Sequence, residues 1–336
     1  MPSCTRERRS GFAGRRLPDG PAGETPARAD RTWGMISRST LIGALVVVEL
    51  AIIGVAAKAI SGDAPAASFN WTNGWSRSSN TVTSRLNKTF VTGAAPRVVL
   101  DVDNADVTVQ AGVANTVHVD GTMSVSHRHG GVEPALDAMR TTDGVRVAVE
   151  SGLTYGNVQR QVRITVPPDA QVEVASAASV VANGLRAKFI ARLHDGDVRI
   201  SNHRGDIDVS TSSGDIDLLD AQGTAFMLHA DDGAVKLTSS GADHVDARTG
   251  SGAISAVDLR AVNGALQSGD GAIDVSFAPE SDAVVNLHTS DGSIKGVTAT
   301  DGTAARSVHL GSGRGQFVIS TVDGSITITP GATNHA

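Results

Sequence analysis

The fold of this 336-residue chain is decided by three consecutive segments, GDIDLLDAQGTAFMLHADD (214–232), GAVKLTSSGADHVDARTGS (233–251) and GAISAVDLRAVNGALQSGD (252–270). Each segment begins with glycine and continues with alternating apolar and polar residues, the period-two pattern of a β-strand that buries one face. The glycine recurs at Gly271, Gly292 and Gly313, after intervals of 19, 21 and 21 residues. This regular period predicts a repeat architecture.

Four columns of mainly apolar residues define the repeat. The residues two and four positions after the glycine predict one strand, with Ile216, Val235, Ile254, Ile273 and Ile294 in the first column and Leu218, Leu237, Ala256, Val275, Gly296 and Phe317 in the second. The residues five and seven positions before it predict another, with Val209, Leu228, Ala247, Leu266, Leu287 and Val308, and Ile207, Phe226, Val245, Gly264, Val285 and Arg306. Two such short strands cannot bury their own apolar side chains, so each unit must stack on the next, like residue on like.

The sequence therefore predicts an all-β fold: a parallel β-solenoid (β-helix-like) of about 20-residue coils with two short strands each, preceded by one transmembrane helix. Pairs such as Ser213-Gly214 and Asp232-Gly233 mark the corners of the coils, where turn residues are favoured. An antiparallel sandwich or meander of hairpins is the alternative, because turn spacing alone also fits it. The solenoid is favoured because side-chain type recurs at the full period.

The one strongly apolar run is LIGALVVVELAIIGVAAKAI (41–60), which is long enough to cross a bilayer as a helix. Arg28, Arg31 and Arg38 precede it, which places the N-terminus in the cytoplasm and the repeats outside. Glu49 lies near its middle and either contacts a partner helix or is carried by its apolar neighbours. Cleavage of this segment, and a translation start at Met35 instead of Met1, stay open.

The chain divides into six parts: a disordered cytoplasmic N-terminus (1–38), a transmembrane helix or uncleaved signal anchor (39–60), a linker (61–80), an irregular β-strand capping region (81–168), regular β-solenoid repeats (169–330) and a tail (331–336). The capping region alternates as strands at 98–100, 107–109, 117–119, 145–149 and 162–166. We expect it to cover the open end of the solenoid, because an uncovered parallel edge invites aggregation.

Composition restricts the function classes. The first 60 residues carry a net charge of +4 and the remainder carries −10, so the predicted ectodomain repels nucleic acid. The single cysteine, Cys4, excludes an intrachain disulfide framework and a cysteine metal cluster. No paired carboxylate cleft, nucleophilic triad, phosphate loop or zinc spacing appears, so we expect no catalytic, cofactor-binding or metal-binding residues.

Two motifs resemble known binding sites, one for calcium and one for integrins. Asp206, Asp208, Asp215 and Asp217 crowd two neighbouring half-coils, as calcium ligands do, but a calcium roll needs aspartate two positions after the glycine. That position is apolar here, so solvated turn carboxylates are expected. Arg204-Gly205-Asp206 matches the tripeptide of integrin ligands, but its Gly-Asp is the corner of the repeat itself.

Histidines recur in an outward column four positions before the glycine, which contains His229, Arg248, Gln267, His288 and His309. If the strands stack in register, His288 and His309 lie about 5 Å apart and would either bind a metal or repel each other when protonated. An ordinary exposed polar column is the simpler expectation. The segment His127-Arg128-His129 is expected to be a loop.

Several segments resemble the bacterial putative-adhesin family of β-strand-repeat envelope proteins, which carries a domain of unknown function. The residues that carry the likeness are Ile164-Thr165-Val166-Pro167, Ser213-Gly214-Asp215-Ile216-Asp217-Leu218, Ser251-Gly252-Ala253-Ile254 and Asp291-Gly292-Ser293-Ile294, and the likeness spans Val98 to Ile328. The resemblance implies a membrane-tethered, extracytoplasmic, non-enzymatic domain and offers no catalytic residues. The sequence departs from the pattern at 175–180, where no Ser-Gly step occurs.

We therefore expect a non-enzymatic protein of the cell membrane, single-pass, with its β domain extracytoplasmic, acting as an adhesin or envelope-interaction module. One alternative is a regulatory or scaffolding partner of another membrane protein, contacted through Glu49 and the helix. A β-helix carbohydrate-active enzyme is less favoured, because the chain has one tyrosine and its tryptophans, Trp33, Trp71 and Trp75, lie outside the repeats. The sequence identifies no ligand, oligomeric state or solenoid handedness.

Overall fold

A computed structural model describes residues 80–127, 136–149, 157–296 and 305–329. The described residues contain 22 β-strands and no helix, so none of them belongs to a helix capable of crossing a membrane. The predictions for 1–38, 39–60, 331–336, most of the 61–80 linker and the 128–129 part of the expected histidine loop lie outside the described residues.

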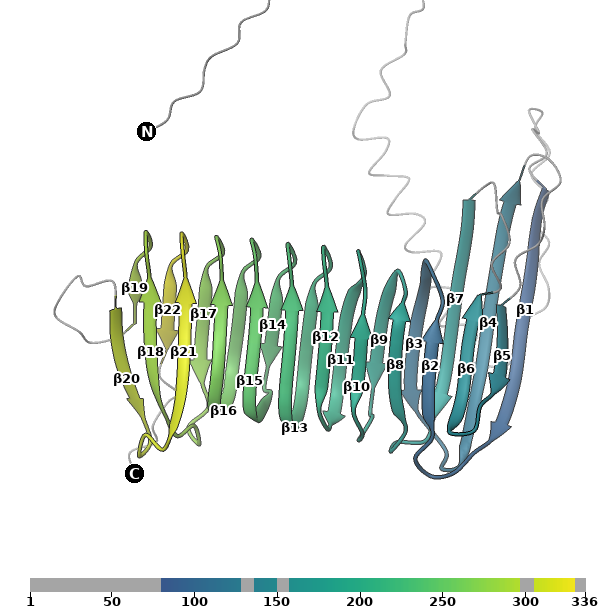
Figure 1. Cartoon of the computed structure of the whole chain (residues 1–336), viewed down its shortest axis with the longest axis horizontal. Helices are drawn as coiled ribbons and strands as arrows, with labels where there is room; N and C mark the ends of the chain where they lie inside the picture. The colour runs from purple at the N-terminus through teal and green to yellow at the C-terminus, as the bar shows by residue number, and fades with distance from the viewer. Residues whose placement is uncertain (1–79, 128–135, 150–156, 297–304, 330–336) are drawn as a thin grey trace, which may run out of the picture. The chain divides into compact units, whose positions relative to one another are not determined.

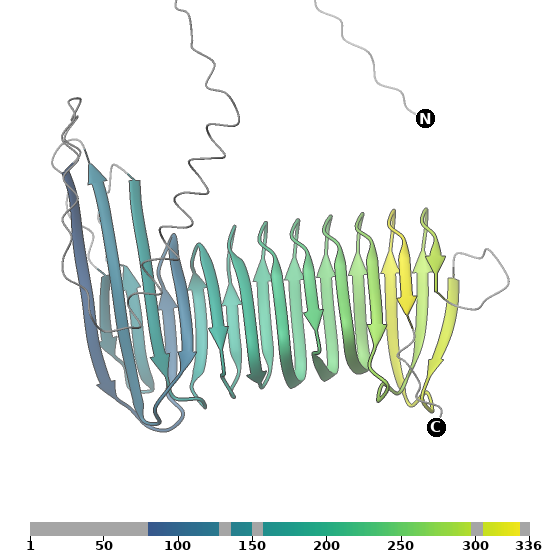
Figure 2. The ribbon, with the colours of Figure 1, turned by 180° about the vertical axis from the view of Figure 1, so that it is seen from behind.

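The strands build two faces that lie back to back along one axis (Figure 1; Figure 2). In spatial order, face 1 contains β1 (Asn80–Val91), β4 (Thr116–His127), β7 (Asn157–Val166), β3 (Ala105–Ala111), β9 (Ser179–Asn183), β11 (Asp197–Arg204), the first half of β13 (Ile216–Ala230), β14 (Val235–Thr238), the first half of β16 (Ile254–Ser268), β17 (Ile273–Phe277), β22 (Ile326–Thr329) and β19 (Ile294–Lys295).

Face 2 is built from the alternate strands. In the same direction it contains β5 (Leu136–Arg140), β6 (Gly144–Val149), β2 (Arg97–Asp101), β8 (Gln171–Ser176), β10 (Phe189–Arg192), β12 (Ile207–Thr211), the second half of β13, β15 (Gly241–Thr249), the second half of β16, β21 (Gly315–Thr321), β18 (Ala283–Thr289) and β20 (Ala305–Leu310). A rung is defined as one strand of face 1 together with the strand of face 2 at the same level of the stack. The long strands β13 and β16 bend around the corner between the faces.

The predicted columns stack in parallel register through the central rungs. Ile254 pairs with Val235 on one side and Ile273 on the other, as predicted, and all three side chains are buried. Neighbouring strands are parallel except at the two ends, so the antiparallel sandwich is wrong for the repeats. Apolar side chains alternate inward along each strand and form one continuous core between the faces.

The predicted order of rungs fails at the C-terminal end. Leu266 does not pair with Leu287: β21, the penultimate strand of the described chain, lies between them and pairs Ile319 with both. On the other face β22 separates β17 from β19 in the same way. Phe317 therefore belongs to the column of Val245 and Gly264, and Gly324 instead of Gly313 takes the place of the repeat glycine. Arg306 and Val308 lie in β20, which is antiparallel to β18.

The N-terminal end is interleaved in the same manner. Strands β2 and β3 form a parallel rung between β6/β7 and β8/β9, although β4 to β7 follow them in sequence. The strands expected between 98 and 166 lie in β2, β3, β4, β6 and β7, while β1 and β5 were not predicted. At each end, an outer group of strands therefore joins the central stack through one interleaved rung. That rung is β2/β3 at the N-terminal end and β21/β22 at the C-terminal end, and each is distant in sequence from the central strands that it contacts.

A ladder of hydroxyl groups closes the turns on one edge of the stack. The residue three positions before each turn glycine donates its hydroxyl to the glycine carbonyl of the preceding rung and accepts the N–H of its own glycine. The residues that do so are Thr211, Thr249, Ser268, Thr321 and Thr289. All five side chains are buried. The motif Ser/Thr-x-x-Gly in the sequence is the signal for this ladder, which the columns of apolar residues alone do not predict.

Ala230 interrupts the ladder between Thr211 and Thr249. We expect Ala230→Ser to raise the free energy of unfolding by about 0.5–1.5 kcal/mol, because the new hydroxyl would bridge the Gly214 carbonyl and the Gly233 N–H. The converse variant, Thr249→Ala, should lower it by about 1–3 kcal/mol, since two buried backbone groups lose their partner. Urea unfolding measures both. Equal midpoints for the two variants would contradict the ladder.

Candidate interaction surface

The outer side of face 2 carries a shallow hollow centred on Met227. It has a volume of about 400 Å3 and is lined chiefly by Arg192, Asp208, Met227, His229, Asp246 and Arg248. The strands that supply these residues are β10, β12, β13 and β15, which lie side by side in register. Met227 lies between Asp208 and Asp246 in one outward column, and 54% of its surface is exposed. The hollow thus spans four successive rungs.

Two Arg–Asp ion pairs and a histidine–aspartate contact surround the methionine. Arg192 Nη2 lies 2.6 Å from Asp208 Oδ2, and Arg248 binds Asp246 through Nε and Nη2 at 2.9 and 2.8 Å. His229 Nε2 lies 3.1 Å from Asp231 Oδ1. Such exposed pairs contribute little to stability, but they compensate the charges around Met227. A flexible apolar side chain within a charged rim is a common feature of protein interfaces.

The four aspartates considered as calcium ligands are not brought together. Asp208 pairs with Arg192 on face 2, whereas Asp217 pairs with Arg199 Nε on face 1 at 3.1 Å. Asp206 Oδ1 accepts the N–H groups of residues 224 and 225, and Asp215 Oδ1 accepts that of residue 234. Each carboxylate is engaged by the neighbouring rung. Among the described residues, no group of three or more potential metal ligands was found.

We therefore expect calcium to leave the thermal stability unchanged. The melting temperature of residues 61–336 should be the same in millimolar calcium and in chelator, because a ligand that binds only the folded state would raise it with concentration. Differential scanning calorimetry across a calcium series is the measurement. A midpoint that climbs with calcium would show that these carboxylates bind the ion.

The Arg204-Gly205-Asp206 tripeptide lies at the corner between the faces, and both of its charged side chains are occupied. Arg204 Nη1 donates to the backbone carbonyls of Asp220 and His203 at 2.9 and 3.0 Å. Asp206 accepts backbone N–H groups of the next rung, as described above. These contacts link successive rungs.

The histidine column is confirmed only in part. His229 pairs with Arg248 and Arg248 with Gln267, as predicted. His288 is separated from Gln267 by Ser320 of the interleaved strand β21. His309 lies in the antiparallel strand β20, where it pairs with Val284. The expected adjacency of His288 and His309 is therefore wrong, and with it the metal pair.

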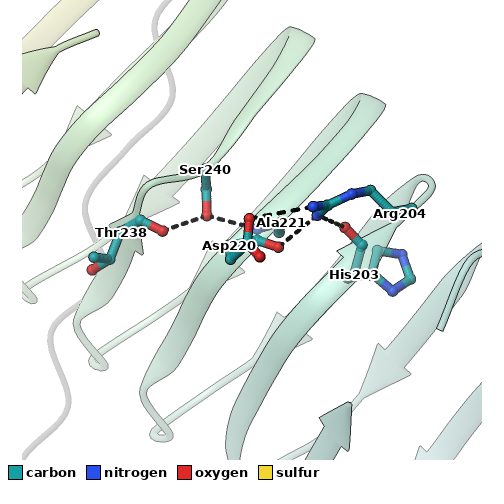
Figure 3. A network of polar contacts seen from close by, with 6 residues as sticks. All are labelled: His203, Arg204, Asp220, Ala221, Thr238 and Ser240. Atoms are coloured by element: carbon teal, nitrogen blue, oxygen red, sulfur yellow. Dashed lines mark hydrogen bonds and ion pairs between the residues drawn. The ribbon is translucent and has the colours of Figure 1, made fainter. Parts of the chain in front are cut away.

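The corner between the faces holds one buried titratable group, His203 (Figure 3). At the same place in the following rungs Ala221 and Ser240 stack, and Ser240 Oγ accepts the Ala221 N–H at 3.2 Å and donates to the Thr238 carbonyl at 2.8 Å. Neither ring nitrogen of His203 has a hydrogen-bond partner in good geometry. Its ring lies edge-on to Phe189, with centroids 6.5 Å apart.

Burial lowers the pKa of His203 to about 4, and the nearby backbone of Asp206 and Gly205 offsets only part of this effect. The imidazole is therefore neutral at physiological pH and fills the core as an apolar ring would. The sequence analysis missed His203, although it occupies the column seven positions after the glycine that also contains Ala221, Ser240 and Leu259.

The Toastrack DUF4097 family profile matches residues 96–329, which include all the described strands from β2 to β22. The chain belongs to this family. The match begins at the first interleaved rung and ends with the last strand, so both interleaved ends are part of the Toastrack domain. This confirms the resemblance proposed from the sequence, in a family whose function is unknown.

Solved structures similar to this Toastrack chain include three bacterial proteins with adhesion-related names. A putative adhesin from Parabacteroides merdae is 13% identical with a TM-score of 0.44, covering 74% of this chain and 95% of that one. One from Bacteroides fragilis is 10% identical with a TM-score of 0.42, covering 73% and 97%. A putative cell adhesion protein from Clostridium sporogenes is 10% identical with a TM-score of 0.25, covering 75% and 100%. No curated protein matches the chain.

Proposed function

We propose that this chain is a membrane-anchored, non-enzymatic envelope protein that binds a macromolecular partner through the outer side of face 2, in the manner of an adhesin. The single observation that carries the proposal is Met227, an exposed apolar side chain between two Arg–Asp pairs on the outer side of face 2. Methionine and arginine are enriched at protein interfaces, and a central apolar residue inside a polar rim is the usual anatomy of a binding hot spot.

The absence of catalysis is part of the proposal. Its support is that both carboxylates that line the Met227 hollow are paired with arginines of the hollow, and His229 contacts Asp231 beside it, so each of these groups is already engaged. The membrane anchor rests on the apolar run at 41–60. A protein tethered there through a short linker would hold the solenoid close to the outer surface of the membrane.

The test compares Met227→Asp with Leu219→Asp in residues 61–336, using immobilised cell-wall material and solubilised envelope proteins as separate targets. Leu219 is the matched control, because it is 48% exposed and lies on face 1 between Ser201 and Thr238. Met227→Asp should weaken binding about 30-fold, the effect of losing a hot spot worth about 2 kcal/mol. Leu219→Asp should bind as the unchanged protein does.

Loss of binding in the Leu219 variant alone would assign the partner to face 1. Capture of the same envelope protein by residues 1–75 without the solenoid would favour the alternative in which the transmembrane helix and Glu49 make the contact. Protease added to intact cells should remove the solenoid if it lies outside the membrane, and protection of the solenoid would contradict the proposed topology.

A further inference from the structure

The interleaved C-terminal rung fills a slot in the stack. By hydrogen-bonded pairing among the described strands, β18, β19 and β20 join the rest of the solenoid only through β21 and β22. Removing that rung would leave an unpaired edge on β16/β17 and a second one on β18/β19. The slot between these edges is therefore a site for two parallel strands, and in this structure the C-terminal rung of the chain occupies it.

The slot is specific for the side chains of that rung. Phe317 pairs with Gly264 of β16, and its buried ring lies edge-on to Phe277 with centroids 5.8 Å apart. Thr321 Oγ1 donates to the Gly271 carbonyl at 3.0 Å, and the Gly324 carbonyl accepts the hydroxyl of Thr289 at 3.1 Å. If Val285 stacked on Gly264 instead, its smaller side chain would leave part of the volume of the Phe317 ring empty, which is unfavourable.

A short glycine loop connects the rung to the strand before it. The loop is Gly311-Ser312-Gly313-Arg314, and both glycines have positive φ, 58° and 71°. Asp282 holds it closed: its Oδ1 accepts the hydroxyl of Ser312 at 3.0 Å and the N–H of Arg314 at 3.1 Å, and its Oδ2 binds Arg314 Nε. The hydrogen bonds from Arg314 lower the pKa of Asp282 below its usual range, so the clamp is charged at neutral pH.

We propose that this slot is a strand-acceptor site and that its partner is the C-terminal rung of a second copy of this chain, which gives a strand-swapped dimer. The rung of a second copy would reproduce every contact inside the slot, so closed monomer and swapped dimer differ mainly at the loop. The Asp282 clamp favours the closed loop. A short hinge of this kind is the usual starting point of swapping. The inference does not depend on the proposed binding function.

The experiment co-expresses two full-length chains that carry different affinity tags, both with Cys4→Ser. One chain carries Asp274→Cys and the other Thr327→Cys, because Asp274 of β17 pairs directly with Thr327 of β22. Adjacent strands bring two Cα atoms within disulfide range. The double variant in one chain is the positive control for the intramolecular bond. Chains that share the same substitution are the control for random cross-linking.

Swapping predicts disulfide-linked dimers of the mixed pair at least about fivefold above the same-substitution controls, and more of them when both chains also carry Asp282→Asn, which weakens the clamp. Mixed dimers no more frequent than these controls would overturn the proposal. The proposal would also fail if Asp282→Asn left the dimer fraction unchanged in chains whose thermal unfolding remains cooperative. Light scattering of each purified variant gives the dimer fraction independently of the disulfide.

Discussion

Gly252→Ala is expected to lower the free energy of unfolding by about 3–5 kcal/mol, although it adds only one methyl group. A Cβ at this position would lie 2.5 Å from the carbonyl carbon of Gly233 and 2.8 Å from Thr249 Oγ1. Neither neighbour can retreat: the carbonyl belongs to the backbone of the preceding rung, and the hydroxyl is held in the turn ladder. Hydrogen bonding fixes the rungs about 4.8 Å apart, so the turn must distort.

The matched control is Gly93→Ala, because a Cβ at Gly93 would meet no atom within 4 Å. It should change the free energy of unfolding by less than about 0.5 kcal/mol. Urea unfolding of residues 61–336 measures both variants. Similar midpoints for the two would mean that the close stacking of the turns is not what restricts this position to glycine.

The second large effect is a loss of stability in mild acid that depends on one residue. The pKa of His203 is about 4 in the folded protein and about 6.5 in an unfolded chain. Between these values the unfolded chain binds a proton that the folded protein does not, so stability falls as the pH drops from 6.5 to 4. The loss from this residue should be on the order of 3 kcal/mol.

His203→Leu should remove most of this pH dependence, because leucine does not titrate and Leu259 already occupies the same column three rungs further along. His229→Gln, a change at an exposed histidine on face 2, should keep it. Urea unfolding of residues 61–336 between pH 4 and 7.5 provides the comparison. The assignment fails if the leucine variant and the unchanged protein lose the same free energy over this range.

Much of the fold could be predicted from sequence because the repeat is local. The alternation after Gly214, Gly233 and Gly252 fixes which side chains point inward, and a unit this small must stack on its neighbours. Pairing of Ile254 with Val235 and Ile273 follows from these facts alone. The candidate site is a different case. Met227 lies between two aspartates in an outward column, and nothing in its local sequence distinguishes an exposed methionine there from one that a neighbour covers.

The positions of His203 and of the hydroxyl ladder could also be predicted from the repeat. Both occupy columns at fixed distances from the repeat glycine, so extending the column analysis to positions three before and seven after it would have found them. That His203 is buried without a good hydrogen bond could not be predicted, because it depends on how Phe189 and the corner of the preceding rung close over the ring.

The sequence by itself determined the rung: its length, its two strands, its inward columns and its glycine turns, all of which depend on residues close together in the chain. Only the tertiary structure decided the order of the rungs at the two ends. The segments 283–295 and 315–329 carry nearly the same pattern, so either could pair with β16 and β17 by backbone hydrogen bonds. The choice between them depends on contacts distant in sequence, above all the packing of Phe317 against Phe277.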